Sequence, residues 1–549
     1  MVENGMIYFA KSGESKDELK EKIYLDPRMA NRHGFICGAT GTGKTVTLKV
    51  LAESFSALGV PVFVSDVKGD VSGLLNPGTD SESMQKRIVR FGLEDTFSYK
   101  GFPCNFFDIY GEKGIHLRTT VSEMGPQLMA KVLELNDTQT DLLTVIYKIA
   151  DDNDLLLVDT KDLKACLNYA YDNAAMFEME YGHISKSSIS TIVRSIVSLE
   201  SEGADEFFGE PAIDIKDFFK TDDKGMGMIN ILDSEALINK PRLYAAFMLF
   251  LLSELFEVLP EVGDPEKPKM VFFFDEAHLL FKNATSTLME KIEQVIKLIR
   301  SKGVSIFFVT QSPGDIPDAV MSQLSNKIEH ALRAYTPAEK KALKAAADAF
   351  RENPDFNTLE LLQELGTGEA IVSTLDEHGI PGVAQHAFIL PPESSMEAIS
   401  EEQRREAIDD SRLKVKYADV AETDSAYEFL QRLKQQEMEA AAALKEEYEE
   451  AVRQEKEAKQ AAKEAEKAEK EAIKQAEKEA KAAEREAAKK SNAFKNAAKS
   501  VSSTAGGTVG RELGKAVGKT LGGSFGKTLG GNLGASLGRN IFGTLFKLK

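Results

Sequence analysis

Hydrophobic residues in the first 410 positions recur in short runs that alternate with amphipathic stretches. The runs are rich in Val, Ile and Phe, and they occupy residues 34–38, 60–66, 270–276 and 304–311. The stretches between them, such as the one at about 288–300, have helical spacing. This alternation is typical of a parallel sheet covered by helices on both faces. Two more runs, at 368–375 and 383–390, predict a closing pair of strands.

Changes in this pattern divide the chain into parts. Residues 1–410 are predicted to form one α/β domain, interrupted at about 120–225 by a mostly helical insertion. Residues 411–434 are predicted to be a linker. Residues 435–490 consist almost entirely of Ala, Glu and Lys, which favour helix. Because large apolar residues for a coiled-coil seam are nearly absent, we expect a single helix or a weak coiled coil.

The last part of the chain, 491–549, carries a repeat. From Gly510 to Gly538, eight glycines recur at every fourth position, each after an apolar residue. On a helix this spacing suits close helix packing, but glycine costs about 1 kcal/mol per position relative to Ala. Residues 506–549 contain seven Lys or Arg and one Glu, a net charge of 7 − 1 = +6. The tail is predicted to fold on an anionic membrane or a partner, to stay disordered, or to pack as a helix.

Composition narrows the class of protein. The net charge of −19 disfavours a generally basic nucleic-acid-binding surface, although it leaves room for a local one. The three cysteines lack metal-ligand spacing, which predicts neither a zinc site nor a disulfide framework and fits a reducing compartment. The N-terminus has no secretion-signal pattern and no apolar run could span a bilayer. A cytoplasmic location is predicted.

The strongest chemical signal follows the first apolar run. GATGTGKT matches the phosphate-binding pattern G-x-x-x-x-G-K-[ST], with a strand-like run before it and a helical stretch after it. Glycines let consecutive backbone N–H groups point at phosphate oxygens, and the helix N-terminus attracts the same anion. We expect Lys44 to neutralise the β- and γ-phosphates of ATP and the Thr45 hydroxyl to bind Mg²⁺. The predicted ATP-binding residues are Gly38, Ala39, Thr40, Gly41, Thr42, Gly43, Lys44 and Thr45.

Acidic and amide residues end the later strands. Asp275 and Glu276 follow a run of apolar residues, so we expect Asp275 to hold Mg²⁺ and Glu276 to polarise the attacking water. Gln311 ends the next strand and is either a sensor of the γ-phosphate or its water, or a simple loop amide. Asp66 ends the strand after the phosphate-loop helix, and either contacts the nucleotide's water or metal or caps a turn.

Three arginines are candidates to stabilise charge at the γ-phosphate, within the chain or from a neighbouring subunit. They are Arg32, Arg300 and Arg333, each of which could instead form an ordinary surface ion pair. His33 and His278 flank the motifs without metal-ligand spacing, and we expect both to be structural.

The motifs together are similar to those of a known family. RHGFICGATGTGKT, DVKGD, VFFFDEAHLLF, IRSKGVSIFFVTQSPGDIPD and LGTGEAIVSTLDEHGIPGV, spread over about 20–430, resemble the HerA-like branch of the HerA–FtsK ATPases, and most of all its bacterial YjgR-like members. The resemblance implies a RecA-type core, a hexameric ring and, for archaeal HerA, a DNA translocase that works with a nuclease. Archaeal HerA has a β-barrel before its phosphate loop, for which the roughly 33 residues before the first strand here are too few.

By motif, the resemblance carries the ATPase centre onto particular residues. It implies catalytic roles for Lys44, Glu276, Gln311, Arg32 and Arg300, Mg²⁺ ligation by Thr45 and Asp275, and the family's acidic position at Asp66.

The predicted fold is therefore α/β, with a RecA-like P-loop NTPase core, a helical insertion and a long helical C-terminal extension. The predicted function is Mg-dependent ATP hydrolysis by a homohexameric motor that acts on DNA. An alternative is a membrane-associated ATPase that remodels or moves protein through residues 506–549, at the inner face of the membrane. A third is a nucleotide-gated scaffold with slow turnover.

Overall fold

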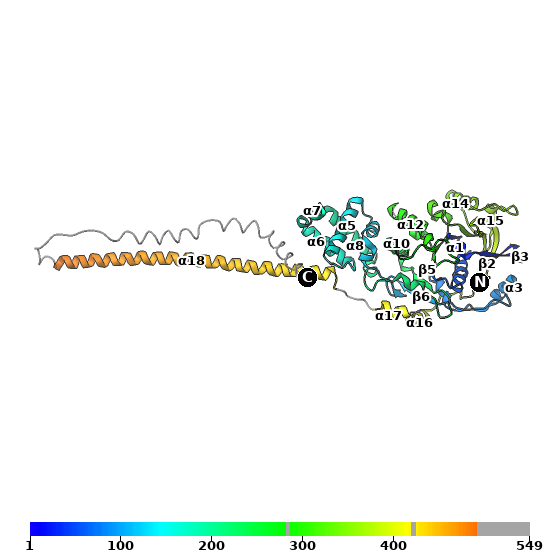
Figure 1. Cartoon of the computed structure of the whole chain (residues 1–549), viewed down its shortest axis with the longest axis horizontal. Coiled ribbons are helices and arrows are strands. Elements are labelled where there is room, and N and C mark those ends of the chain that lie inside the picture. The colour runs from blue at the N-terminus through cyan, green and yellow to red at the C-terminus, as the bar shows by residue number, and fades with distance from the viewer. Residues whose placement is uncertain (282–285, 419–423, 491–549) are drawn as a thin grey trace. The chain divides into compact units, whose positions relative to one another are not determined.

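A computed structural model describes residues 1–281, 286–418 and 424–490 (Figure 1). The chain divides into two compact units, Met1–Ala441 and Ala442–Lys549. The first unit contains the predicted α/β domain. The glycine repeat, with the predictions that depend on it, lies outside the described residues.

The core of the first unit is one mixed sheet in the order β1-β2-β13-β12-β11-β4-β10-β9-β5-β8-β6-β7, with β3 paired to β2. The strands from β11 to β7 in this order are all parallel. Most of their residues are buried, as expected for a parallel sheet covered on both faces. Their bounds are β4 Gly34–Cys37, β5 Val62–Asp66, β6 Cys104–Asp108, β7 Ile115–His116, β8 Ile229–Asp233, β9 Met270–Phe274, β10 Val304–Thr310 and β11 Asn326–His330.

The other edge of the sheet is antiparallel. The predicted closing pair is confirmed by β12 (Glu369–Ser373) and β13 (Gln385–Ile389). The N-terminal residues, for which the sequence indicated no strand, continue this edge through β1 (Val2–Glu3), β2 (Met6–Ser15) and β3 (Glu18–Leu25). The residues before the phosphate loop therefore extend the core sheet.

Alternate residues of the central strands bury their side chains on opposite faces. Phe273 and Phe307 pack against Phe55 of α2 on one face, whereas Phe308 packs against Phe281 of α11 on the other. Helices thus cover both faces, which confirms the predicted α/β class. Up to residue 364, the helices outside the insertion are α1 Pro27–Ala30, α2 Lys44–Ala57, α3 Glu82–Phe91, α10 Pro241–Val258, α11 His278–Phe281, α12 Ser286–Ile299, α13 Asp318–Met321, α14 Pro337–Asp348 and α15 Thr358–Glu364. The 3₁₀ turns outside the insertion are η1 Asp70–Leu75, η3 Ala236–Asn239, η4 Arg300–Lys302 and η5 Pro313–Asp315, while η2 Ile215–Phe219 lies within it.

The helical insertion lies between β7 and β8 in the sequence and at one end of the first unit, with the β2–β3 hairpin at the other (Figure 1). Its first two helices begin with capping boxes at Thr120 and Asn136, which satisfy their free N–H groups. The insertion helices are α4 Val121–Val132, α5 Asp137–Asp152, α6 Thr160–Asp172, α7 Ala174–Tyr181, α8 Lys186–Glu200 and α9 Ala204–Phe207.

The segment predicted as a linker, 411–434, is mostly folded where it is described. It contains α17 (Arg412–Tyr417), which follows α16 (Glu401–Asp410), and the start of α18 (Ala426–Lys490). The Tyr417 hydroxyl donates to Asp217 at 2.5 Å, and the Ser425 hydroxyl donates to Asp162 at 2.6 Å. These polar anchors come from residues far apart in the sequence, so local composition did not reveal them.

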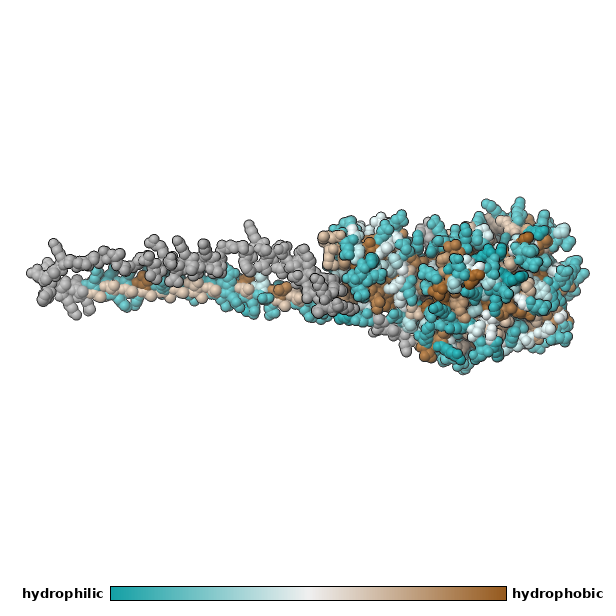
Figure 2. Space-filling model, in the orientation of Figure 1, coloured by the Kyte–Doolittle hydropathy of each residue, from teal (hydrophilic) through white to brown (hydrophobic). Residues whose placement is uncertain are grey.

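Between residues 442 and 485, α18 is exposed except at the partly exposed Val452, and hydrophilic residues alternate with weakly hydrophobic ones along it (Figure 2). Ion pairs between residues four apart, such as Glu455–Lys459 and Glu466–Lys470, support it as expected for an Ala/Glu/Lys helix. Among the described residues, no helix is both long and apolar enough to cross a bilayer.

Candidate active site

The loop Gly38–Thr45 connects β4 to α2 at the carboxyl edge of the parallel strands. The Ala39 N–H donates to the Ala331 carbonyl at 2.8 Å, which ties the loop to the end of the neighbouring strand β11. Gly43 caps α2 with φ +114°, a conformation that side chains rarely adopt. A Cβ there would lie 3.3 Å from Gly368 Cα, a close approach that adds to the preference for glycine.

Lys44 is buried beneath this loop. Its Nζ donates to the carbonyls of Gly38 at 2.6 Å and Ala39 at 3.1 Å. Burial lowers the pKa of Lys44, and the nearby Lys68 lowers it further. Thr45 lies half-buried in the first turn of α2. The two side chains predicted to bind phosphate and metal therefore start from the same helix end.

Asp275 and Glu276 follow β9 two strands away from β4. Asp275 is 4% exposed; one of its oxygens accepts from the Glu276 N–H at 3.0 Å, and Oδ2 has no hydrogen-bond partner among the described residues. Carboxylate oxygens of Asp66, Asp70 and Asp275 all lie within 4.8 Å of one another. An all-oxygen donor set with a buried, unpartnered oxygen suits a hard divalent cation such as Mg²⁺.

Asp66 caps a turn and also lies beside the other site carboxylates, so the structure is compatible with both of the roles considered from the sequence. Its carboxylate accepts from the backbone N–H groups of Lys68 at 3.2 Å, Gly69 at 2.7 Å and Val71 at 3.1 Å, so it caps the turn that leads into η1. It also belongs to the acidic group with Asp275. Burial raises the pKa of Asp66 to about 6. Contact with metal or water remains a prediction for this residue.

Glu276 is connected through hydrogen bonds to Gln311 and to the phosphate loop. Its Oε1 accepts from Gln311 Nε2 at 2.9 Å and lies 2.5 Å from Lys68 Nζ. Gln311 Oε1 in turn accepts from the Thr40 hydroxyl at 3.1 Å, within the phosphate loop. Burial raises the pKa of Glu276, but the hydrogen bonds from Lys68 and Gln311 outweigh burial and lower it overall. Glu276 has φ +47°, an uncommon conformation for a residue with a side chain.

The two flanking histidines differ. His33 is structural, as expected: it is buried, accepts from the Ile306 N–H at 3.1 Å and donates to the Ile296 carbonyl at 3.0 Å. His278, which we also expected to be structural, lies 3.3 Å from Glu276 Oε2 and thus borders the site. The first turn of α11 carries His278 back toward the end of β9.

His330 supports the phosphate loop and was not found from the sequence. It ends β11, fully buried, with its Nδ1 donating to the Glu369 carbonyl at 2.8 Å and its Nε2 2.8 Å from the Thr47 hydroxyl. Burial lowers its pKa to about 4, so the ring is neutral and its Nε2 accepts from Thr47. A single histidine at the end of a strand with the mixed sequence NKIEH carries no sequence signal for this role.

Two of the candidate arginines lie away from the phosphate loop of their own chain. Arg32 precedes β4 and Arg300 begins η4 before β10, so both lie at the amino edge of the sheet, whereas the loop follows the carboxyl end of β4. The four residues of β4 span about 13 Å between these edges. Both guanidinium groups pair with Asp264, at 3.8 and 3.3 Å. The structure therefore does not support the prediction that Arg32 or Arg300 contacts the γ-phosphate bound by its own chain. A role for either arginine in a neighbouring subunit stays a prediction.

Arg333 lies on the nucleotide side of the sheet. It follows Ala331, whose carbonyl holds the phosphate loop, and its guanidinium donates to the backbone carbonyls of Gln363 and Leu365. Arg333 is exposed. Of the three candidate arginines, it is thus the one that borders the loop within the chain.

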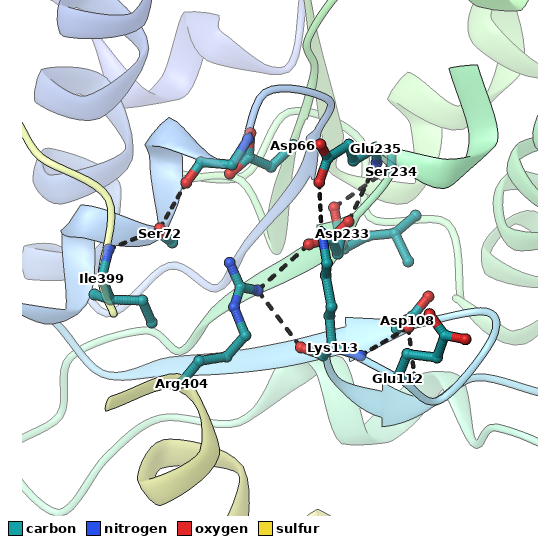
Figure 3. Close-up of polar contacts among 12 residues, drawn as sticks. Asp66, Ser72, Asp108, Glu112, Lys113, Asp233, Ser234, Glu235, Ile399 and Arg404 are labelled. Atoms are coloured by element: carbon teal, nitrogen blue, oxygen red, sulfur yellow. Dashed lines mark hydrogen bonds and ion pairs between the residues drawn. The ribbon is translucent and has the colours of Figure 1, made fainter. Parts of the chain in front are cut away.

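Four neighbouring strands end in aspartate, but their carboxylates have different partners. Asp66, Asp233 and Asp108 occupy the same register on β5, β8 and β6 (Figure 3). Asp233 lies 3.5 Å from the buried guanidinium of Arg404 on α16, and Asp108 accepts backbone N–H groups of its own loop. Asp275, directly after β9, instead has one oxygen without a hydrogen-bond partner among the described residues. An apolar strand that ends in aspartate is therefore a weak signal without the phosphate loop beside it.

Comparison with known proteins agrees with this geometry. Residues 11–527 match the family described as Helicase HerA-like C-terminal. The chain belongs to this family. Among characterised HerA relatives, it is 22% identical over 357 residues to the DNA double-strand break repair helicase HerA of Sulfolobus acidocaldarius, covering 64% of this chain and 63% of that protein.

A probable helicase of Methanocaldococcus jannaschii is also 22% identical to this HerA-family chain, over 367 residues that cover 65% of the chain and 63% of the relative. The chain thus spans less than two thirds of the length of these curated relatives. Among solved structures, the bacterial conjugative coupling protein TrwB is similar at 15% identity and a TM-score of 0.44, covering 70% of this chain and 89% of that one. The family resemblance seen in the motifs is confirmed.

Proposed function

We propose that this HerA-family protein is a Mg-dependent ATPase of the P-loop class. The observation that carries the proposal is the chain of contacts from Thr40 through Gln311 to Glu276, beside Asp275, whose Oδ2 has no hydrogen-bond partner among the described residues. It joins a phosphate-binding loop, a polar sensor and an acidic strand end within one site. Phosphoryl transfer requires these parts together, because positioning and charge stabilisation supply most of its catalysis.

Each residue has a definite task in this proposal. The loop N–H groups and Lys44 bind the phosphates of ATP, and Thr45 and Asp275 hold Mg²⁺, which neutralises charge on the phosphate oxygens. Glu276, ionised at neutral pH because its pKa is lowered, accepts a hydrogen bond from the attacking water and then its proton. Gln311 Nε2 donates to Glu276 Oε1 and so orients the carboxylate. Gln311 Oε1 accepts from the Thr40 hydroxyl, which connects the carboxylate to the phosphate loop.

We further propose that the ATPase is a homohexameric motor that acts on DNA. Family membership supports this, as does a basic surface next to the site. Lys340, Lys341 and Lys344 are exposed on α14 and have no ion-pair partner among the described residues, although the chain as a whole is acidic. Tyr335, 83% exposed, precedes this helix. Free cations beside an exposed aromatic ring are typical of nucleic-acid contacts.

In such a ring, Arg32 and Arg300 would act from a neighbouring subunit. Their side chains are partly exposed, and Asp264 holds both at the edge opposite the phosphate loop. Hydrolysis would then depend on assembly, because the charge they supply is missing from an isolated subunit.

The test is an ATPase assay with purified full-length protein, Mg²⁺ and, in separate reactions, single-stranded DNA, duplex DNA, RNA or anionic liposomes. We expect turnover that DNA stimulates, that Lys44→Ala abolishes with loss of nucleotide affinity, and that Glu276→Gln abolishes with affinity retained. Failure of the wild-type protein to bind ATP with Mg²⁺ would remove the ATPase proposal. Turnover that no nucleic acid changes would remove the DNA motor, and stimulation by liposomes instead would favour a membrane-associated ATPase.

A further inference from the structure

We propose that Lys68 is a positioning residue that competes with Mg²⁺ for the carboxylates of the site and holds Glu276 away from the attacking water until the metal displaces it. This inference rests on the proposed ATPase function. The proposal assigns Lys68 a task separate from phosphate binding, which the loop and Lys44 perform.

Backbone hydrogen bonds hold Lys68 in a turn, and its side chain is partly exposed. Lys68 lies between β5 and η1, where the Asp66 carboxylate accepts its N–H and that of Gly69. From this turn the side chain reaches to the end of β9, placing Nζ 2.5 Å from Glu276 Oε1. The Lys68 side chain is 40% exposed, whereas that of Glu276 is 5% exposed. A partly exposed ammonium therefore lies between solvent and a buried carboxylate.

The carboxylates of the site outnumber the cations that contact them. Asp66, Asp70 and Asp275 share one small region, with Glu276 adjacent to Asp275. Lys44 gives its hydrogen bonds to loop carbonyls. Buried carboxylates are costly unless a cation or several hydrogen bonds compensate them. The Lys68 ammonium supplies that compensation at Glu276, and its charge also attracts the carboxylate of the neighbouring Asp275.

A divalent cation bound by Asp275 needs the same negative potential. Like charges a few ångströms apart repel each other strongly in a partly desolvated site. Mg²⁺ at Asp275 and the Lys68 ammonium at Glu276 therefore destabilise each other. Binding of one is expected to drive the other outward, and the exposed lysine is the group that can move.

The contact with Lys68 also bears on the proton acceptor. Glu276 Oε1 receives two donors, Lys68 and Gln311. Glu276 Oε2 has no hydrogen-bond partner among the described residues and lies 3.3 Å from His278 Nδ1. An ammonium in contact with Oε1 draws negative charge from the carboxylate as a whole, so either oxygen is a poorer acceptor for a water proton while Lys68 is bound. Departure of Lys68 leaves the Gln311 hydrogen bond in place, so Glu276 stays oriented while its oxygen becomes available. In this way the metal would switch on the base, and hydrolysis without it would be suppressed.

The experiment measures Mn²⁺ binding to the nucleotide-free full-length protein by the electron paramagnetic resonance signal of free Mn²⁺. Lys68→Met removes the charge and keeps the length of the side chain. We expect this variant to bind Mn²⁺ at least about tenfold more tightly than wild type, which corresponds to about 1.4 kcal/mol. Lys68→Arg, which keeps the charge, is expected to restore the wild-type affinity, and Asp275→Asn added to Lys68→Met to abolish the gain.

The matched control is Lys86→Met. Lys86 forms an exposed ion pair with Glu82 on α3 at 2.6 Å, so its loss removes the same charge from an ordinary surface pair and should leave Mn²⁺ affinity unchanged. Equal Mn²⁺ affinities of wild type and Lys68→Met, or no Mn²⁺ binding by either, would overturn the inference. Because nucleotide is absent from this measurement, its failure is distinct from a wild-type protein that does not bind or hydrolyse ATP.

Discussion

Replacing Asp275 by Asn is expected to stabilise the nucleotide-free protein at neutral and alkaline pH. Asp275 is 4% exposed, and its Oδ2 has no hydrogen-bond partner among the described residues. Asparagine keeps the oxygen that accepts from the Glu276 N–H and replaces Oδ2 by an NH₂ group. That group can donate toward the carboxylates of Asp66 and Asp70, which lie within 4.8 Å of the Asp275 ligand oxygen. The substitution thus removes an unpaired buried charge.

The pKa of Asp275 gives the size and the pH dependence of the expected change in stability. Burial raises it from 3.8 to about 7 in the folded protein. The folded protein therefore binds the proton more tightly than the unfolded chain does, so stability falls as pH rises from about 4 to about 7 and then stays level. At about 1.36 kcal/mol per pH unit, the cost reaches roughly 4 kcal/mol above pH 7 and is roughly 2 kcal/mol at pH 5. These values are upper bounds for the gain from Asn.

The assay is thermal unfolding in EDTA at pH 5 and pH 8. For a unit of 441 residues, 1 kcal/mol corresponds to about 1 °C in Tm. The advantage of Asp275→Asn over wild type should therefore widen by about 2–3 °C from pH 5 to pH 8, while Asp141→Asn, an exposed site on α5, should show no such change. A variant that is less stable than wild type at pH 8, or an advantage independent of pH, would refute the reasoning.

Two further predictions concern the loop and the basic surface. Gly43→Ala puts a side chain on a residue with φ +114° and places its Cβ 3.3 Å from Gly368 Cα, so nucleotide affinity should fall at least about tenfold and the free energy of unfolding by about 1–3 kcal/mol. The control Gly263→Ala, with φ +67° in open space, should lower stability alone. Equal nucleotide affinities of Gly43→Ala and wild type in calorimetry would contradict this prediction. Replacing Lys340, Lys341 and Lys344 together by Ala should lower the magnitude of the slope of log affinity for duplex DNA against log salt concentration by about 2–3, as measured by fluorescence anisotropy. The same change at Lys463, Lys467 and Lys474 of α18 should leave the slope unchanged. An unchanged slope in the α14 variant would exclude α14 as a DNA-binding surface.

The sequence was sufficient for the parts of the site that follow buried parallel strands. Cys37 at the end of β4 pairs in register with Thr310 at the end of β10, so the phosphate loop and Gln311 must emerge side by side. Phe274 on β9 pairs with Phe308 on β10, which brings the acidic strand end to the same edge. Hydrophobic pattern fixes the strands, and parallel pairing then fixes which polar residues meet.

The remaining features depend on contacts that no local pattern encodes. Lys68 and His330 act through single side chains that reach across to other elements. The N-terminal hairpin mixes polar and apolar residues because it lies at the sheet edge, where strand alternation is interrupted by irregular pairing. Arg32 and Arg300 differ from these features, because each precedes a predicted strand and strand direction alone places both at the amino edge of the sheet.

Lys44 and Lys68 link binding of the nucleotide's phosphates at the loop to binding of Mg²⁺ at the acidic strand ends. Lys44 donates to carbonyls of its own loop, and Lys68 contacts Glu276 on the neighbouring edge, while Thr40 and Gln311 connect the two. A triphosphate would draw Lys44 from its carbonyls, and Mg²⁺ would repel Lys68 from Glu276. Since both displacements change hydrogen bonds at opposite ends of the Thr40–Gln311–Glu276 chain, metal and phosphate should bind with positive coupling. In Lys68→Met that coupling should weaken, because one of the two displacements no longer occurs.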